Sequence, residues 1–167
     1  TGPTNLRDPS GVKVIKIETA KDMLQACLDS LPADIAICAA AVADWHVVNK
    51  SEQKIKKCDS GSVSVLELNG NPDILKTLSN LDSNRPDLVV GFAAETENLI
   101  NNAVKKQKNK GCDWILANDV SESTGIFGGE NNLVHLITDK GSEEWPLMLK
   151  EDVAIRLVEK IVNEIEK

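Results

Sequence analysis

Aromatic side chains are scarce in this sequence. They make up 3% of its 167 residues, and there is no tyrosine. A core must therefore be built from valine, isoleucine, leucine and alanine. With 41% hydrophobic and 27% charged residues, the chain is globular rather than disordered. Its length fits a single domain with one sizeable core.

The sequence also lacks an excess of basic residues. It has 26 acidic and 19 basic side chains, which gives a formal net charge of -7. Domains that bind nucleic acid usually carry a basic surface, so the composition argues against that class of protein. The positions of the lysines therefore carry more information than their number.

No stretch approaches the ~18 consecutive apolar residues of a membrane-spanning helix, and no signal-peptide pattern opens the sequence. The cysteines are scattered without C-x-x-C spacing, so neither a zinc site nor a disulfide framework is supported. Cys38 and Cys112 stand in apolar surroundings, and we expect both to be buried. These features predict a reducing, cytoplasmic setting without membrane or nucleic-acid partners.

Two common signatures of nucleotide-binding proteins are missing. The sequence contains neither the G-x-G-x-x-G fingerprint of dinucleotide-binding folds nor a P-loop. His46 and His135 belong to no recognisable metal-binding or catalytic pattern. An NAD(P)-dependent dehydrogenase and an enzyme with an activated protein nucleophile are both disfavoured.

One stretch does point to a ligand. The apolar run Ile35–Cys38 predicts a buried strand, and the side chains then shrink to alanine before the lone carboxylate of Asp44. A polar connection follows and ends in the lysine cluster Lys54–Lys57. Small residues, an acid and lysines after a strand favour a nucleotide or phosphoester site at the carboxyl edge of a sheet. An ordinary strand exit followed by a solvated loop explains the same residues, and both interpretations stay open here.

The rest of the chain alternates predicted strands with predicted helices, which indicates a mainly parallel sheet with helices packed on it. A short antiparallel hairpin is expected between residues 54–57 and 61–68. Asn71 is expected to cap a helix that has Pro72 at its first position. The exits 39–44, 92–96 and 117–119 are expected to line up along one edge of the sheet. Further strands are expected at 12–17, 88–94, 114–117 and 133–137. Helices are expected after Thr19, over 97–110 and from about Lys150. The buried face of the last helix would include Val153, Ile155, Leu157, Val158, Ile161, Val162 and Ile165.

Lysines that could meet a polyanion recur in two places. One group is the cluster at 54–57, and the other is on the helix expected over 97–110. On that helix Lys106 and Lys110 are four residues apart, so their like charges repel unless an anion lies between them. A solvated helix edge is the plainer explanation. The full set comprises Lys54, Lys56, Lys57, Lys105, Lys106, Lys108 and Lys110.

Several short motifs, taken together in their order, resemble one family. They are Ala40-Ala41-Val42-Ala43-Asp44-Trp45, Lys54-Ile55-Lys56-Lys57, Asn71-Pro72-Asp73-Ile74, Gly91-Phe92-Ala93-Ala94-Glu95-Thr96, Lys110-Gly111-Cys112-Asp113 and Ala117-Asn118-Asp119-Val120. The family is phosphopantothenate–cysteine ligase (phosphopantothenoylcysteine synthetase), in its bacterial CTP-using form. The resemblance extends over nearly the whole chain and implies a Rossmann-like three-layer α/β fold with a mainly parallel sheet and a small antiparallel flap hairpin.

The resemblance also implies an activity. The family joins 4'-phosphopantothenate to cysteine through an acyl-cytidylate on the route to coenzyme A, with CTP as co-substrate and Mg²⁺ accompanying the triphosphate. It does not identify which residues, if any, would be metal ligands, so the metal site is left unassigned. Carried over to this chain, Lys54 is the catalytic residue, and the nucleotide-binding residues are Ala39, Ala40, Asp44, Lys54, Asn71, Pro72, Asp73, Ile74, Phe92, Lys106 and Lys110.

The resemblance further implies a homodimer and, in many members, fusion to a flavin-dependent decarboxylase. Family members carry an N-terminal βα unit that precedes the segment matched here. We therefore expect residues 1–167 to form a single ligase domain that is truncated at its N-terminus. The alternative is a nucleotide-binding module of the same fold that is catalytically incomplete.

Overall fold

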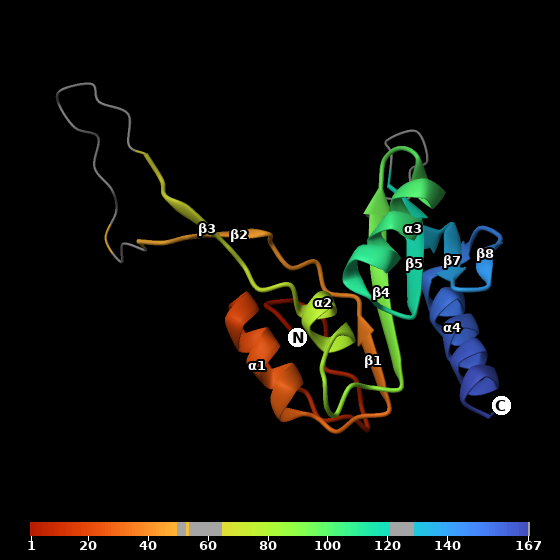
Figure 1. The fold of residues 1–167 in the computed structure, drawn as a ribbon, viewed down its shortest axis with the longest axis horizontal. Helices are drawn as coiled ribbons and strands as arrows, with labels where there is room; N and C mark the ends of the chain where they lie inside the picture. Colours follow the sequence, from red (N-terminus) through yellow and green to blue (C-terminus); the bar gives the residue numbers. More distant parts are fainter. Residues whose placement is uncertain (50–52, 54–64, 121–128, 167) are drawn as a thin grey trace. The chain divides into compact units, whose positions relative to one another are not determined.

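The computed structural model describes residues 1–49, 53, 65–120 and 129–166. The chain divides into two compact units, and each is described by itself. Unit 1 comprises Thr1–Ser30 and Ala40–Ile74, and unit 2 comprises Leu31–Ala39 and Leu75–Lys167. In chain order the elements are α1 (Ala20–Asp29), β1 (Ile35–Cys38), β2 (Trp45–Val47), β3 (Leu68–Gly70), α2 (Ile74–Ser79), β4 (Leu88–Glu95), α3 (Leu99–Lys110), β5 (Trp114–Asp119), β6 (Asn131–Asn132), β7 (Val134–Thr138), β8 (Gly141–Glu144), β9 (Met148–Leu149) and α4 (Lys150–Ile165) (Figure 1).

Unit 2 is built on a five-stranded sheet with the strand order β1-β4-β5-β7-β8. The strands β1, β4 and β5 are parallel, whereas β7 and β8 extend the sheet in antiparallel fashion. Helix α3 forms the crossover between the parallel neighbours β4 and β5, as expected for a βαβ unit. This arrangement confirms the predicted Rossmann-like α/β fold, with an antiparallel extension on one side.

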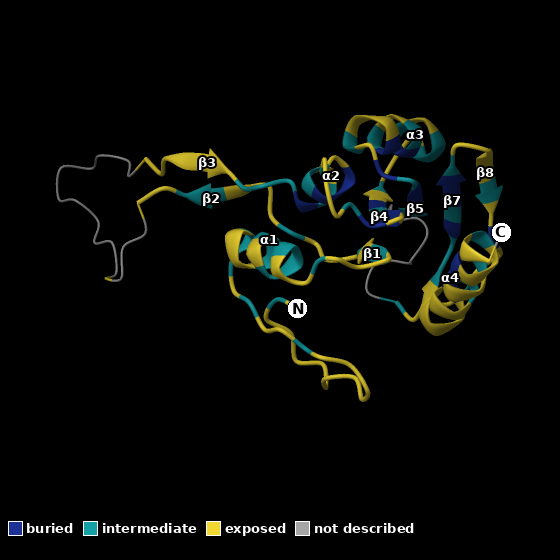
Figure 2. Cartoon of the chain, turned by 60° about the horizontal axis from the view of Figure 1, so that its bottom comes forward, coloured by how far each residue is buried: buried dark blue, intermediate teal, exposed yellow. Residues whose placement is uncertain are grey.

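The central strands bury both of their faces, and each face belongs to a different hydrophobic cluster. Successive side chains of a strand point to opposite faces of the sheet. On β4, Val90 packs with Leu157 of α4, whereas Val89 packs with Ala103 of α3. Figure 2 shows the resulting dark blue interior along β4, β5 and β7. Helices therefore cover both faces of the sheet, which is the three-layer arrangement predicted from the sequence.

In unit 1, helix α1 begins where the sequence predicts. The Thr19 hydroxyl accepts from the backbone N–H of Asp22 at 3.1 Å, and the Asp22 carboxylate accepts from the Thr19 N–H at 3.0 Å. This reciprocal pair is a capping box. The helix ends at Asp29, ahead of Pro32, a residue that helices do not readily continue through.

The strand predicted at residues 12–17 is not formed. Within the described part of the chain, its backbone bonds to Thr1: the Thr1 amino group donates to the Ile15 carbonyl at 2.7 Å, and the Ile17 N–H donates to the Thr1 carbonyl at 3.0 Å. A strand needs a neighbour that continues the ladder, and a single residue does not supply one. The prediction of a strand from the alternating pattern is therefore wrong.

A small antiparallel hairpin is present in unit 1, as predicted. β2 pairs with β3, with Trp45 opposite Gly70 and Val47 opposite Leu68. The expected pairing of residues 54–57 with 61–68 falls mostly on residues outside the described part of the chain. The observed pairing joins residues 45–47 to 68–70.

Helix α4 differs from the prediction in how much of it is buried. Val153, Leu157 and Ile161 are in the core, as expected. The remaining predicted core residues are exposed, because α4 meets the sheet along one stripe only. These are Ile155 (58% exposed), Val158 (56%), Val162 (45%) and Ile165 (54%).

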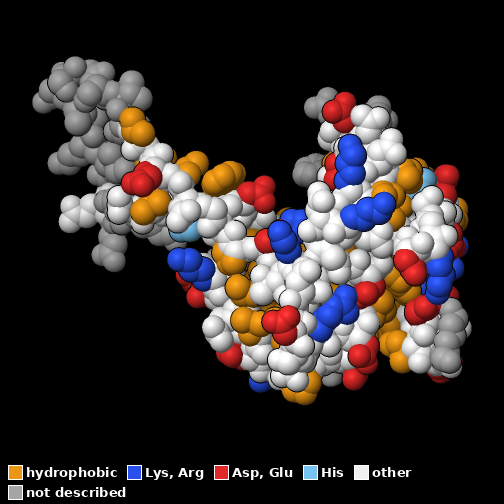
Figure 3. Space-filling model, in the orientation of Figure 1, with side chains coloured by type: hydrophobic (Ala, Val, Ile, Leu, Met, Phe, Trp, Pro, Cys, Tyr) orange, Lys and Arg blue, Asp and Glu red, His pale blue; other side chains and the backbone are white. Residues whose placement is uncertain are grey.

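No helix in the described ranges has both the length and the apolar content needed to cross a bilayer. Acidic and basic side chains are interspersed on the face shown in Figure 3.

Candidate functional site

The parallel strands of unit 2 end side by side, as the sequence predicts for a ligand site. In the register of β4 with β5, Ala94 lies opposite Asn118 and Glu95 lies opposite Asp119. The backbone N–H of Val120 donates to the Glu95 carbonyl at 2.9 Å and continues this pairing beyond the strands. Ala39 directly follows β1, the neighbour of β4 on its other side. Small and acidic residues therefore gather at the carboxyl edge, where ligands of open α/β sheets bind.

A second group of predicted site residues comes together in unit 1. The backbone N–H of Asn71 donates to the carbonyl of Asp44 at 2.8 Å, and its side-chain amide donates to the carbonyl of Ala43, also at 2.8 Å. Asn71 thereby fixes the segment that carries Ala40 and Asp44. The side chain of Asp44 is exposed, so its carboxylate is available to a ligand.

The helix-capping role predicted for Asn71 is wrong. Helix α2 begins at Ile74, three residues later, and the Asn71 amide is used to hold residue 43 instead. Pro72 and Asp73 are half-buried, and Ile74 is buried. The segment 71–73 is therefore an extended connection that enters α2.

The four lysines of helix α3 differ in their exposure to solvent. Lys106 and Lys110 are half-buried, whereas Lys105 and Lys108 are exposed. The half-buried pair stands four residues apart and so occupies one side of the helix. These are the two lysines that the resemblance assigns to the nucleotide phosphates.

The structure does not bring that lysine pair to the strand exits. Helix α3 starts at Leu99, after β4 ends, and runs back to the start of β5 at Trp114. At a rise of about 1.5 Å per residue, Lys106 is about 10 Å and Lys110 about 16 Å along the helix from Leu99. The predicted site therefore has one part at the carboxyl edge and another along α3.

Phe92, predicted to wall the nucleotide pocket, points to the other face of the sheet. It packs against the cluster that includes Leu157 of α4, whereas α3 covers the opposite face. A ligand that touches both Phe92 and the lysines of α3 would have to cross the sheet edge. Lys54, Lys56 and Lys57 lie outside the described residues, so their predicted roles remain predictions.

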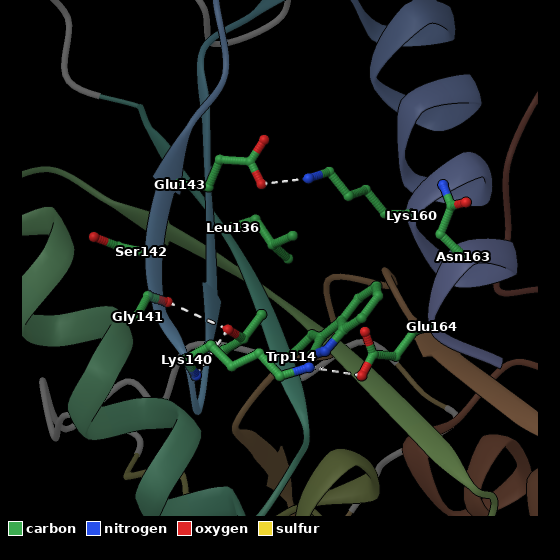
Figure 4. Close-up of a pocket in the computed structure, with 10 residues that line it drawn as sticks. Trp114, Leu136, Lys140, Gly141, Ser142, Glu143, Lys160, Asn163 and Glu164 are labelled. Carbon is green, nitrogen blue, oxygen red and sulfur yellow. Dashed lines mark hydrogen bonds and ion pairs between the residues drawn. The ribbon is translucent and has the colours of Figure 1, made fainter. Parts of the chain in front are cut away.

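A pocket of about 420 Å³ lies away from the predicted site. Its lining includes Trp114 at the start of β5 and Thr138 at the end of β7, so it opens at the edge opposite the strand exits (Figure 4). Charged residues at its rim pair with each other: Lys160 contacts Glu143 at 2.6 Å and Lys140 contacts Glu164 at 2.9 Å. The hydrogen bond from Lys160 lowers the pKa of Glu143, with a further contribution from Arg156, although burial acts in the opposite direction. These mutual pairs hold α4 to the β7–β8 hairpin.

The described residues contain no group of three or more His, Cys, Asp and Glu side chains placed to hold a metal ion. Cys112 is buried, as predicted, and Cys38 is half-buried. Burial raises the pKa of the Cys112 thiol to about 11. This thiol is therefore protonated at neutral pH and has the character of a core residue.

Sequence reasoning missed a cluster of polar residues at the end of α3. Asn80, Arg85, Gln107 and Asp113 connect the ends of α2 and α3 to the starts of β4 and β5. The available signal was the presence of hydrogen-bonding side chains in and just after the predicted helices.

Comparison with known proteins gives one consistent result. Residues 1–165 match the model of the DNA/pantothenate metabolism flavoprotein C-terminal domain. The chain is 40% identical over 167 residues to the Haemophilus influenzae protein named coenzyme A biosynthesis bifunctional protein CoaBC, and 37% identical over 169 residues to the Escherichia coli K12 protein of the same name. The match covers 99% and 100% of this chain but 41% of each relative. The chain thus spans about two fifths of the length of these relatives.

Solved structures agree with this result. The crystal structure of the C-terminal domain of a coenzyme A biosynthesis bifunctional protein CoaBC superposes with a TM-score of 0.76 at 34% identity, covering 99% of this chain and 72% of the other. A DNA/pantothenate metabolism flavoprotein from Streptococcus pneumoniae reaches a TM-score of 0.74 at 19% identity, which supports the fold alone.

Proposed function

The chain belongs to the family of DNA/pantothenate metabolism flavoprotein C-terminal domains, and from this premise we propose that it carries the CTP-dependent phosphopantothenate–cysteine ligase activity of coenzyme A biosynthesis. The observation that carries the proposal is the family match over residues 1–165, which includes every residue assigned to the nucleotide. The 40% identity to a coenzyme A biosynthesis bifunctional protein supports it.

The proposed reaction has two steps. An oxygen of the phosphopantothenate carboxylate attacks the α-phosphorus of CTP, the bond from that phosphorus to the bridging oxygen breaks, and pyrophosphate leaves. The amine of cysteine then attacks the acyl carbon of the acyl-cytidylate, the bond to CMP breaks, and the amine loses a proton as the amide forms. Neither step requires a nucleophile from the protein, only positioning and charge neutralisation.

The residues of this chain would serve those two needs. Asp44 and the Asn71-supported segment would hold the nucleoside in unit 1. The half-buried Lys106 and Lys110 would neutralise phosphate charge along α3, and Lys54 would act at the reacting phosphate. The residues Ala39, Ala40, Pro72, Asp73, Ile74 and Phe92 would complete the nucleotide contacts.

Mg²⁺ would arrive with the nucleotide. Mg²⁺ commonly binds through substrate phosphates rather than through a dedicated protein cage. When bound it would neutralise triphosphate charge. We also propose a homodimer, and fusion or association with a flavin-dependent decarboxylase, since the relatives are named as bifunctional proteins.

Isothermal titration of the chain with CTP, ATP and NADP tests the proposal, together with pyrophosphate release from CTP in the presence of phosphopantothenate and cysteine. We expect CTP to bind more tightly than ATP or NADP. Absence of CTP binding at millimolar concentration would overturn the proposal. Binding without pyrophosphate release would identify a catalytically incomplete nucleotide-binding module instead.

Lys54→Gln tests the catalytic assignment, and Lys57→Gln is its matched control within the same cluster. We expect Lys54→Gln to lower pyrophosphate release by a factor of about 100 or more, in the range seen when a charged transition-state contact is removed. The Lys57 variant should retain most of the rate. Equal rates for Lys54→Gln and the unmodified chain would refute the role of Lys54.

A further inference from the structure

The last turns of α2 and α3 are tied together by one side chain. The amide nitrogen of Asn80 donates to the carbonyl of Lys110 at 2.8 Å and to the carbonyl of Lys76 at 2.6 Å. Both acceptors are carbonyls in the last turns of their helices, where side chains often supply hydrogen bonds. Asn80 therefore joins the end of one helix to the end of the other.

The chain makes room for this contact at Gly111. Its φ of +74° is in the left-handed region, and a Cβ there would lie 3.0 Å from the Asn80 oxygen. The N–H of Gly111 donates to the Gln107 carbonyl at 2.8 Å and closes the helix. Glycine is thus needed for its conformation and for the close approach of Asn80.

Arg85 and Asp113 secure the same region against the sheet. The Arg85 guanidinium donates to the Ser79 carbonyl at 2.8 Å and to the Asp113 carboxylate at 2.9 Å. That carboxylate also accepts from the backbone N–H of Val89 at 2.7 Å. The Gln107 amide donates to the Asp113 carbonyl at 2.6 Å. The end of α3 is therefore held to α2, to β4 and to the start of β5.

We propose that Asn80 is a positioning residue for the nucleotide phosphates, acting through Lys106 and Lys110. This inference rests on the proposed function. By holding the carbonyl of Lys110, Asn80 fixes the last turn of α3, which carries Lys110 and is preceded by the turn that carries Lys106. It also holds that turn to the end of α2.

A charged side chain neutralises a phosphate best when its backbone is held before the ligand arrives, because less freedom is lost on binding. An exposed lysine on a loosely held helix end would lose more rotamer freedom for the same contact. In this proposal Asn80 itself does not contact the nucleotide. Its effect should therefore disappear when the lysines lose their charge.

A double-mutant cycle measured by CTP titration tests this dependence. We expect Asn80→Ala to weaken CTP binding by a factor of about 5–10, of the order of one lost hydrogen bond. Asn80→Asp, which retains the shape but cannot donate, should weaken CTP binding at least as much. In a chain that carries Lys106→Gln and Lys110→Gln, adding Asn80→Ala should cause little further loss. Asn109→Ala, at an exposed position of the same helix, is the matched control and should leave the affinity unchanged.

Thermal unfolding of each variant shows whether it is folded under the titration conditions. The CTP affinities of Asn80→Asp and Asn80→Ala are compared for folded chains. If the effect of Asn80→Ala is the same with and without the lysine charges, Asn80 has a general structural role and the inference is overturned. It is also overturned if the lysine substitutions leave CTP binding unchanged, or if Asn80→Ala does. In these cases the unmodified chain still binds CTP, so the proposed CTP-dependent activity is not refuted; unchanged binding after the lysine substitutions would refute only the phosphate role given to Lys106 and Lys110. Failure of the unmodified chain to bind CTP would instead refute the proposed function.

Discussion

Asn71 and Asp44 are joined across 26 intervening residues by a backbone hydrogen bond of 2.8 Å. The Asn71 side chain adds a second bond of 2.8 Å to Ala43, the neighbour of Asp44. The resemblance assigns both residues to the nucleotide, and the residue pattern after the first strand already pointed to Asp44. Their pairing gives that assignment a physical basis, because Asn71 shapes the backbone that presents the Asp44 carboxylate.

Asn71→Ala removes the side-chain bond to Ala43 and leaves the backbone bond in place. We expect CTP affinity to fall by a factor of about 5–10, because one hydrogen bond contributes about 1 kcal/mol. Titration of CTP measures the change. Asn69→Ala is the control, since the Asn69 side chain accepts from its own neighbour Gly70. Equal affinities for the Asn71 and Asn69 variants would contradict the role given to Asn71.

Gly91 in the middle of β4 leaves no space for a side chain. A Cβ at this position would lie 2.5 Å from the Cδ2 atom of Leu75 and 2.9 Å from the Cδ1 atom of Ile115. Gly91→Ala should therefore lower the free energy of unfolding by about 1–3 kcal/mol through overpacking. Urea denaturation measures this loss.

The double variant Gly91→Ala, Leu75→Ala tests the cause. Removing the Leu75 side chain relieves the closest contact, so the two substitutions together should cost clearly less than the sum of their separate effects. Gly70→Ala is the control, because a Cβ there meets nothing within 4 Å. Strictly additive losses in the double variant would show that the contact with Leu75 is not the source of the destabilisation.

The sequence predicted correctly those features that depend on residues close together in the chain. The capping box of Thr19 and Asp22 depends on residues three apart, and the helix start after Thr19 was predicted correctly. The buried strand β4 was also predicted, because a strand buried on both faces appears as a continuous apolar run. The side-chain bond from Asn71 to Ala43 depends on a partner 28 residues away, and the sequence offered helix capping as the nearer explanation.

The site shows the same division. The sequence placed small and acidic residues at the ends of β4 and β5, and the register of Glu95 with Asp119 agrees. It did not foresee that α3 carries Lys110 away from that edge, because the direction of a crossover helix follows from the fold. The Asn80 contact with Lys110 has no sequence pattern of its own.

Helix α4 offers a direct test of buried against exposed apolar residues. Leu157 is 5% exposed and Ile155 is 58% exposed, although both carry similar side chains on the same helix. Leu157→Ala should cost about 2–5 kcal/mol of unfolding free energy, as core truncations do. Ile155→Ala should change it by about 0.5 kcal/mol or less.

Urea denaturation of the two variants measures the difference. Each substitution introduces alanine, so helix propensity changes little between them. Comparable losses for Ile155→Ala and Leu157→Ala would mean that the exposed stripe of α4 is covered in solution.

Glu143 couples the stability of the fold to pH. Its carboxylate forms ion pairs with Lys160 at 2.6 Å and with Arg156 at 3.0 Å. These contacts lower its pKa from the ordinary value of 4.5. The folded chain therefore binds the proton more weakly than the unfolded chain does. The stabilisation is present above pH 4.5 and is lost as the pH falls through the lowered pKa of the folded state.

Glu143→Gln removes this contribution. Because the Glu143 side chain is 40% exposed, solvent screening limits the loss at neutral pH to about 0.5–1 kcal/mol. Urea denaturation from about pH 7 down to about pH 3 should show the gap between the unmodified chain and the variant closing below pH 4.5. Glu144→Gln, at the exposed neighbouring position, should preserve the acid dependence of the unmodified chain. A gap between the unmodified chain and Glu143→Gln that stays constant through this range would rule out the ion pairs of Glu143 as its source.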